Sequence, residues 1–161
     1  MTTPEPSTPA DGRGADTGAT LFAATDPAQS AGDHLLVDAF VAAGRTLDNL
    51  PYTTDFDRLL ERVRAKDAAH TAFTVLHRLQ NLRKARKLPT LGRASTPAVK
   101  VSQDEEAALA ALVAEHAGTL GQRDRLLYTP AFDAIVESFN ALTGRTLTHH
   151  DVWRLVAKLA K

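Results

Sequence analysis

The sequence has 161 residues, of which 43% are hydrophobic and 24% are charged, and its formal net charge at pH 7 is zero. These values are ordinary for a soluble protein of one medium domain or two small ones. The absence of cysteine excludes disulfides, thiolate metal sites and thiol nucleophiles. No apolar run reaches the length of a membrane helix and no signal peptide is visible, so we expect a cytoplasmic protein with no membrane partner. The abundance of Ala and Arg suggests a bacterial, high-GC source.

Residues 1–33 are rich in Pro, Gly, Ser, Thr, Ala and Asp, show no apolar periodicity, and carry five acids and one base. Such a segment buries too little apolar surface to offset its ordering entropy, so we expect a disordered N-terminal tail. One apolar island, Thr20–Ala24, interrupts it. This island is either a chance occurrence or a short motif that docks on a protein partner through Leu21 and Phe22.

From His34 the pattern becomes helical, and residues 34–87 predict a first three-helix unit. Its second helix is expected to begin with Thr54 as the N-cap and with two aspartates in the first turn. The apolar positions at helical spacing in the three segments are Leu36, Val37, Phe40, Val41, Phe56, Leu59, Leu60, Val63, Val75, Leu76, Leu79 and Leu82.

Residues 88–102 contain two prolines and a glycine without periodicity, which predicts a linker. Residues 103–161 predict a second three-helix unit, because helix signals recur in the same order. Thr129 and Pro130 open its second helix, Gly144 ends it, and Thr148 with Asp151 forms a capping box before the third. The expected inward positions are Phe132, Ile135, Val136, Phe139, Val152, Leu155, Val156 and Leu159. No strand signal is present.

The two units are related by an internal repeat. A gapless shift of 76 positions matches 12 of the 44 residues from Leu36 to Leu79, where chance gives about 3. The clearest match is between "YTTDFDRLLERV" at Tyr52 and "YTPAFDAIVESF" at Tyr128. We expect both tyrosines to be structural, with the ring on the core and the hydroxyl in water.

The fold class is therefore all-α, with two tandem three-helix bundles of helix-turn-helix type after the tail. The order "DEEAALAALVAEHAG", "FDAIVESFNALTG" and "THHDVWRLVAKLAK" resembles the Myb/SANT-type and trihelix-type modules, and the resemblance covers residues 34–87 and 103–161. Those families usually carry an aromatic residue in each helix, and the first helix of the second unit has none. The resemblance implies DNA binding, although some members of these families bind proteins.

The third helix of each unit is the predicted DNA-contacting element, because Arg, Lys, Asn and Gln contact phosphates and base edges. No acid lies between Asp67 and Asp104, a pattern that favours contact with a polyanion over a solvated helix end. The candidate nucleic-acid-binding residues are His77, Arg78, Asn81, Arg83, Lys84, Arg86, Lys87, Arg93, His150, Arg154, Lys158 and Lys161.

Two alternatives remain open at this point. The gapless shift pairs Arg78 with Arg154, whereas the apolar faces pair His77 with Arg154 and require one extra loop residue in the second unit. The second alternative concerns function: the chain could be a helical adaptor for protein partners, with Trp153 either as an exposed contact or as a core residue.

Enzyme function is not expected, because the sequence has no phosphate-binding loop and no nucleophile–base or metal motif. His149 and His150 are adjacent, so on a helix they diverge by about 100° and are poorly placed to share a metal. We therefore predict a non-catalytic DNA-binding protein with no cofactor, no metal and no small-molecule substrate.

Overall fold

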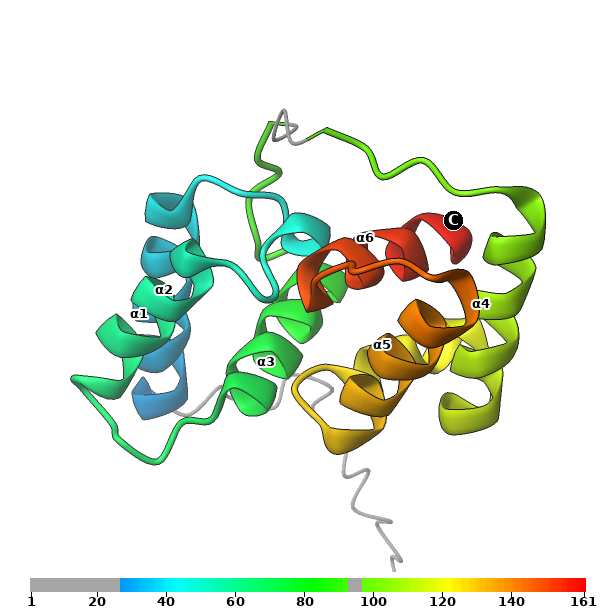
Figure 1. Cartoon of the computed structure of the whole chain (residues 1–161). Helices are drawn as coiled ribbons and strands as arrows, with labels where there is room; N and C mark the ends of the chain where they lie inside the picture. Colours follow the sequence, from blue (N-terminus) through cyan, green and yellow to red (C-terminus); the bar gives the residue numbers. More distant parts are fainter. Residues whose placement is uncertain (1–26, 93–96) are drawn as a thin grey trace, which may run out of the picture.

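The computed structural model describes residues 27–92 and 97–161, and within these ranges every regular element is a helix (Figure 1). The predicted all-α class is confirmed. The first unit contains α1 (Pro27–Ala43), η1 (Leu47–Asn49), α2 (Thr54–Arg64) and α3 (Ala72–Lys84). The second unit contains α4 (Gln103–Ala117), η2 (Leu120–Leu126), α5 (Pro130–Thr143) and α6 (His149–Leu159).

Helix α1 begins earlier than the sequence predicted. It starts at Pro27, so the expected boundary of the tail at residue 33 is wrong by seven residues. A proline suits the first turn of a helix, because its fixed φ is helical and the missing N–H has no partner there in any case. Residues 1–26 lie outside the described part of the chain.

The helix ends show why these segments fold as they do. Helix α2 is capped by Thr53 and not by the predicted Thr54, since the Thr53 hydroxyl accepts a hydrogen bond from the backbone N–H of Phe56 at 3.2 Å. Thr129 caps α5 in the same way, Pro130 follows at the first helical position, and Gly144 ends the helix in the left-handed conformation, as predicted.

The third helices settle the register that the sequence left open. The capping box of α3 joins Thr71 to Thr74, and that of α6 joins Thr148 to Asp151, so the two helices start 77 positions apart. Burial agrees, because Val75 and Val152 are both buried at this shift. His77 is therefore the equivalent of Arg154, and the second unit has one extra residue between the start of its second helix and the start of its third.

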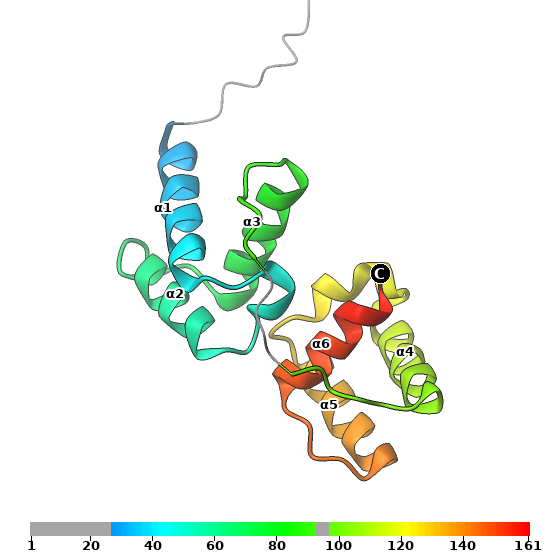
Figure 2. The same cartoon turned by 90° about the horizontal axis from the view of Figure 1, so that it is seen from above.

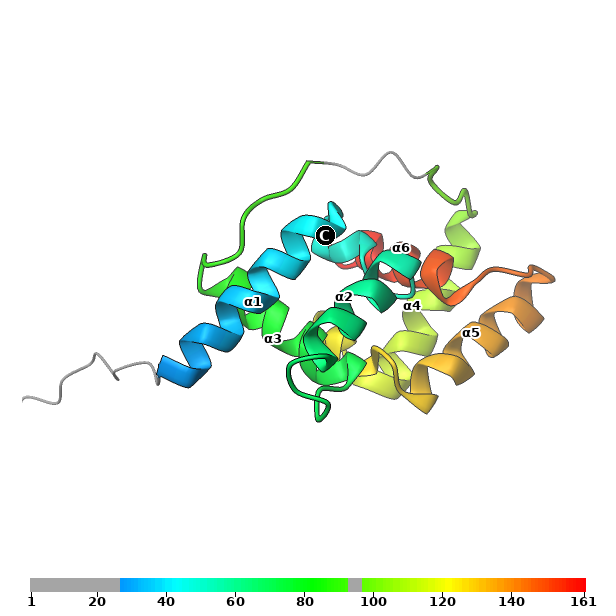
Figure 3. The ribbon, with the colours of Figure 1, turned by 90° about the vertical axis from the view of Figure 1, so that its left-hand side faces the viewer.

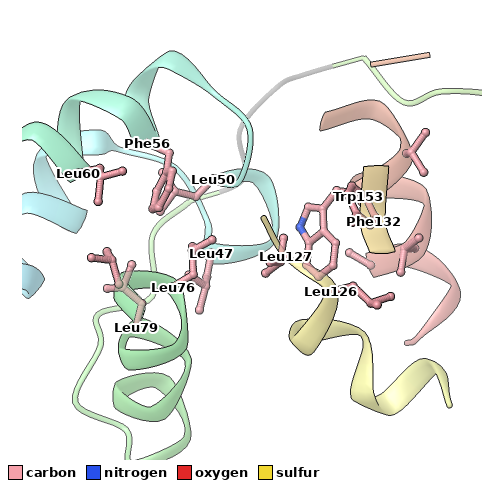
Figure 4. Close-up of a cluster of buried hydrophobic side chains, with 14 of the residues drawn as sticks. Leu47, Leu50, Phe56, Leu60, Leu76, Leu79, Leu126, Leu127, Phe132 and Trp153 are labelled. Atoms are coloured by element: carbon pink, nitrogen blue, oxygen red, sulfur yellow. The ribbon is translucent and has the colours of Figure 1, made fainter. Parts of the chain in front are cut away.

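The apolar positions form one continuous cluster that runs through both units (Figure 4). Nearly all of the predicted inward residues are buried, and Val41, which is 47% exposed, is the main exception. In Figure 4, Leu50, Phe56 and Leu76 lie on the first unit's side, and Leu127 and Trp153 lie on the second unit's side. Trp153 is only 2% exposed, so its ring belongs to the core and is not a surface contact for a partner.

The units lie side by side, with η1 at the junction (Figure 2). Figure 3 views them from the side of α1 and α2, with the second unit behind. Helix α6 packs on α4, α5 and η2 of its own unit and also on η1 of the first unit. The third helix of the second unit is thus covered along one side by the other unit.

The centre of the junction is a reciprocal tyrosine pair. The backbone N–H of Tyr52 donates to the Tyr128 hydroxyl at 2.6 Å, and the backbone N–H of Tyr128 donates to the Tyr52 hydroxyl at 2.7 Å. The two rings are stacked with their centroids 4.3 Å apart. The expectation that both hydroxyls lie in water is wrong, because each hydroxyl binds the opposite unit.

Candidate nucleic-acid interface

Helix α3 carries an exposed face with no acidic residue. Its core side is set by Val75, Leu76 and Leu79, which places His77 and Lys84 in solvent and Asn81 at the edge. Phe73, which is 37% exposed, stacks on the His77 ring with an interplanar angle of 8°. This face offers cationic, amide and aromatic groups together.

A hydrogen-bonded turn at the end of α3 orders the backbone of a group of basic residues. The backbone N–H of Lys87 donates to the Leu82 carbonyl at 2.8 Å, and that of Arg86 donates to the Arg83 carbonyl at 3.0 Å. These two bonds form a Schellman motif, with Arg86 in the left-handed position at a φ of 58°. We call Arg83, Lys84, Arg86 and Lys87 the α3 basic end.

Most of the α3 basic end is free of acidic partners. Among the described residues, Lys84, Arg86 and Lys87 are exposed and none has a carboxylate within ion-pair distance. Arg83 differs, because its Nη1 lies 3.2 Å from Oδ1 of Asp48 in η1. Three uncompensated positive charges are therefore held close together at one end of the helix.

Asp48 joins the ends of the two third helices. Its second carboxylate oxygen, Oδ2, lies 3.3 Å from Nζ of Lys161 just after α6, so Arg83 and Lys161 meet at a single acid. The sequence analysis did not identify Asp48 as part of the site. No pattern in the sequence points to Asp48, because its contacts with Arg83 and Lys161 depend on how the two units pack in three dimensions.

Beside Asp48 lies a shallow groove of about 270 Å³ between η1 and α6, which we call the junction groove. Three of the predicted cations, Arg154, Lys158 and Lys161, line it. Each has a partner within the molecule: Arg154 Nε donates to Asn49 Oδ1 at 3.1 Å, and Lys158 Nζ lies 2.8 Å from Glu106 Oε1. The Arg154 Nη1 also donates to the Pro97 carbonyl of the linker at 2.6 Å.

Two other predicted residues take part in contacts inside the protein. The His150 ring Nδ1 lies 2.8 Å from the Pro51 carbonyl, which ties the start of α6 to the first unit. Arg78 forms a two-point ion pair with Asp33 at 2.6 and 2.7 Å, and this hydrogen bonding raises the pKa of the guanidinium. Neither residue belongs to the exposed face of α3.

The remaining predicted positions are placed as follows. Arg93, Leu21 and Phe22 lie outside the described residues. Within the described ranges, no helix is long and apolar enough to cross a membrane, and no group of three or more His, Asp or Glu residues is placed to hold a metal ion. Thus α3 keeps an open cationic face, whereas the equivalent face of α6 is used to join the units.

Comparison with known protein families, with curated proteins and with solved structures found no match.

Proposed function

We propose that this protein binds duplex DNA through the α3 basic end, the exposed face of α3 and the adjoining end of α6. The carrying observation is the set of three exposed cations, Lys84, Arg86 and Lys87, with no acidic partner among the described residues. A polyanion gains most from such charges, because binding releases counterions from the phosphates without breaking ion pairs in the protein. The resemblance to Myb/SANT-type modules supports the same proposal.

The proposed contact uses the two third helices unequally. Helix α3 presents its open face to the duplex, while α6 contributes only its C-terminal end, because η1 covers its side. The second unit then acts mainly as a platform that holds η1 and Asp48 in position. Phosphate contacts dominate this arrangement, so the binding is expected to depend weakly on DNA sequence.

The test is a fluorescence-anisotropy titration of the full chain with a duplex of mixed sequence. We expect a Kd on the order of micromolar at low salt that weakens steeply as salt rises. The variant Lys84→Ala/Arg86→Ala/Lys87→Ala is expected to bind at least ~10-fold more weakly and to reduce the salt slope by about 3, since each phosphate contact contributes about 0.9.

A matched variant controls for loss of charge alone. Arg58, Arg62 and Arg125 are also exposed but lie on α2 and in η2, so replacing all three with alanine removes the same charge elsewhere. That variant is expected to retain most of the affinity. Equal losses in the two triple variants, or a flat titration of the native chain at low salt, would refute the proposal.

A protein partner is the second candidate function, and the exposed Phe73 favours it. Its ring stands on the same face of α3, stacked on His77, and aromatic side chains are enriched at protein interfaces. Replacing Phe73 with alanine separates the two candidates. A DNA contact through phosphates should be nearly unaffected, whereas a protein contact centred on the ring should weaken by about 10-fold or more.

A further inference from the structure

Helix α3 carries a line of side chains that continues from the α3 basic end toward the start of the helix. Its members follow one another at intervals of three or four residues and therefore lie within about 80° of the helix circumference. Leu76 and Leu79 point from the other side of α3 into the core (Figure 4). We call the following residues the α3 line: Phe73, His77, Asn81 and Lys84.

Two exposed rings form the N-terminal part of the α3 line. The rings of Phe73 and His77 are nearly parallel, and their centroids lie 6.1 Å apart. Nucleobases of every kind stack on aromatic side chains, because each base has a flat π face. The rings therefore offer a surface on which a base that is free of its own duplex can stack.

The next member of the line has unused hydrogen-bonding groups. Asn81 is half-buried, and its side-chain amide makes no hydrogen bond to any other residue that the structure describes. An amide presents a donor and an acceptor side by side, as the edges of bases do. A base stacked on the rings would find this amide one helical turn beyond His77.

Charge along the α3 line is positive at one end only. Lys84 has no carboxylate within ion-pair distance among the described residues, and it adjoins the α3 basic end. Within the same described ranges, the ion pairs of α3 involve Arg78 and Arg83, which lie off the line. Asp67, an exposed carboxylate, lies in the loop before the rings. Phosphates are therefore attracted to the Lys84 end, and the ring end suits an uncharged base.

We propose, on the basis of the DNA binding proposed above, that the α3 line binds an unpaired stretch of strand at the end of a duplex. His77 and Lys84 are seven positions apart, which is about 10.5 Å of helix or about three nucleotides at ~3.4 Å each. Lys84 and the α3 basic end hold the phosphates where the duplex ends. An unpaired base about three nucleotides farther along stacks on Phe73 and His77, and Asn81 meets a base edge between them.

The test is a set of fluorescence-anisotropy titrations of the full chain at one salt concentration. The probes are a blunt duplex, the same duplex with thymine overhangs of four nucleotides at its 3′ or its 5′ ends, and the same overhangs built from abasic sugars. An abasic overhang keeps the phosphates and lacks the bases. We expect a thymine overhang of at least one polarity to bind about 10-fold more tightly than the blunt duplex, because stacking contributes strongly for each base. The abasic overhang should gain at most about 2-fold.

Three variants assign the gain to the rings. Phe73→Ala should lose the gain from the thymine overhang and keep the affinity for the blunt duplex, whereas Phe73→Tyr should keep both. Leu142→Ala removes another exposed apolar side chain, on α5, and should change neither affinity.

Three results would overturn the role of the α3 line: no gain from either thymine overhang, an equal gain from the abasic overhang, or the full gain in Phe73→Ala. If the blunt duplex still binds in these cases, the proposed DNA binding stands without the preference for unpaired strand. Failure of every probe to bind at low salt would refute both.

Discussion

Tyr52 and Tyr128 hold each other in place, since the hydroxyl of each accepts a hydrogen bond from the backbone N–H of the other. Both residues have a positive φ, 60° for Tyr52 and 56° for Tyr128, a conformation that costs on the order of 1 kcal/mol or more for a residue with a bulky side chain. Two hydrogen bonds and a stacked ring contact across the junction offset that strain. The strained backbone at each tyrosine is therefore stabilised by contacts with the other unit.

The reciprocal hydrogen bonds predict that removing either tyrosine hydroxyl lowers the free energy of unfolding by the same amount. Tyr52→Phe and Tyr128→Phe each remove one acceptor and leave one N–H without its partner, so each should lower the free energy of unfolding by about 1–2 kcal/mol. Urea denaturation followed by circular dichroism measures this. A variant as stable as the native chain, or a clear inequality between the two variants, would contradict the reciprocal arrangement.

The tyrosines also predict a loss of stability at alkaline pH. Burial is the main cause that raises the pKa of both side chains well above their ordinary range, and the carboxylates of Asp133 and Asp57 add to it. A raised pKa in the folded state means that the stabilisation is complete below the ordinary tyrosine pKa of about 10 and declines above it. We expect a decline of up to about 1.4 kcal/mol per pH unit for each tyrosine. Urea denaturation between pH 9 and 11 measures it, and the double Phe variant, in which the alkaline decline should be much smaller, is the control.

An acidic transition is expected from the second unit. Arg145 donates two hydrogen bonds to Glu105, at 2.6 and 3.0 Å, and this pairing lowers the pKa of the carboxyl group to about 2. A lowered pKa contributes stability above the ordinary glutamate value of about 4.3, and that contribution disappears as the pH falls toward 2. The thermal midpoint should therefore fall over this window in the native chain and fall less in Glu105→Gln.

Two substitutions of Arg86 distinguish the effect of its backbone strain on stability from the effect of its charge on DNA binding. Its left-handed conformation favours glycine, so Arg86→Gly should raise the free energy of unfolding by about 0.5–1 kcal/mol, after the greater freedom of glycine in the unfolded chain is subtracted. Arg86→Ala keeps the strain and should not stabilise the protein. Both variants lack the guanidinium, so both should bind DNA more weakly than the native chain and equally weakly in the anisotropy titration. Native affinity in both variants would show that the charge of Arg86 does not contribute to binding.

Asp48 is expected to restrain DNA binding. It forms ion pairs with both Arg83 and Lys161 at the place where the ends of the two third helices meet. Asp48→Asn should raise the affinity for duplex DNA by about 3-fold at low salt and by less at high salt, because screening weakens the repulsion between Asp48 and the phosphates. Asp38→Asn removes an exposed acid on α1 and serves as the control. An unchanged affinity in Asp48→Asn would place the DNA contact elsewhere.

Local signals predicted the helices well. Thr129, Pro130 and Gly144 mark the two ends of α5, and Phe56 and Val63 face inward at the expected spacing, because capping and amphipathicity depend only on neighbours along the chain. The start of α1 was missed for the same reason. The segment before His34 has no apolar stripe, and the contact that Asp33 makes there is an ion pair with Arg78, 45 residues away.

The sequence alone did not predict how the two units pack against each other. The spacing of Arg154 on α6 predicted an outward basic face, yet the side chain meets Asn49, 105 residues away. The same holds for His150 and Pro51. Such contacts depend on how two folded units meet, and a pattern within one helix does not encode that geometry. The repeated tyrosine, Tyr52 and Tyr128, is the local sign of the junction, and the sequence predicted a core ring there but not the contact between the units.

A contact to which both halves contribute the same two groups, a hydroxyl and a backbone N–H, is one that two identical molecules could make with each other. Two copies joined in tandem would therefore need no new contact surface, because this pairing has the symmetry of a contact between identical molecules. Fusion also releases the halves from having to stay alike. The contrast between His77 and Arg154 is an example of the difference that this freedom permits. His77 is exposed on α3, whereas Arg154 on α6 contacts Asn49 of the other half.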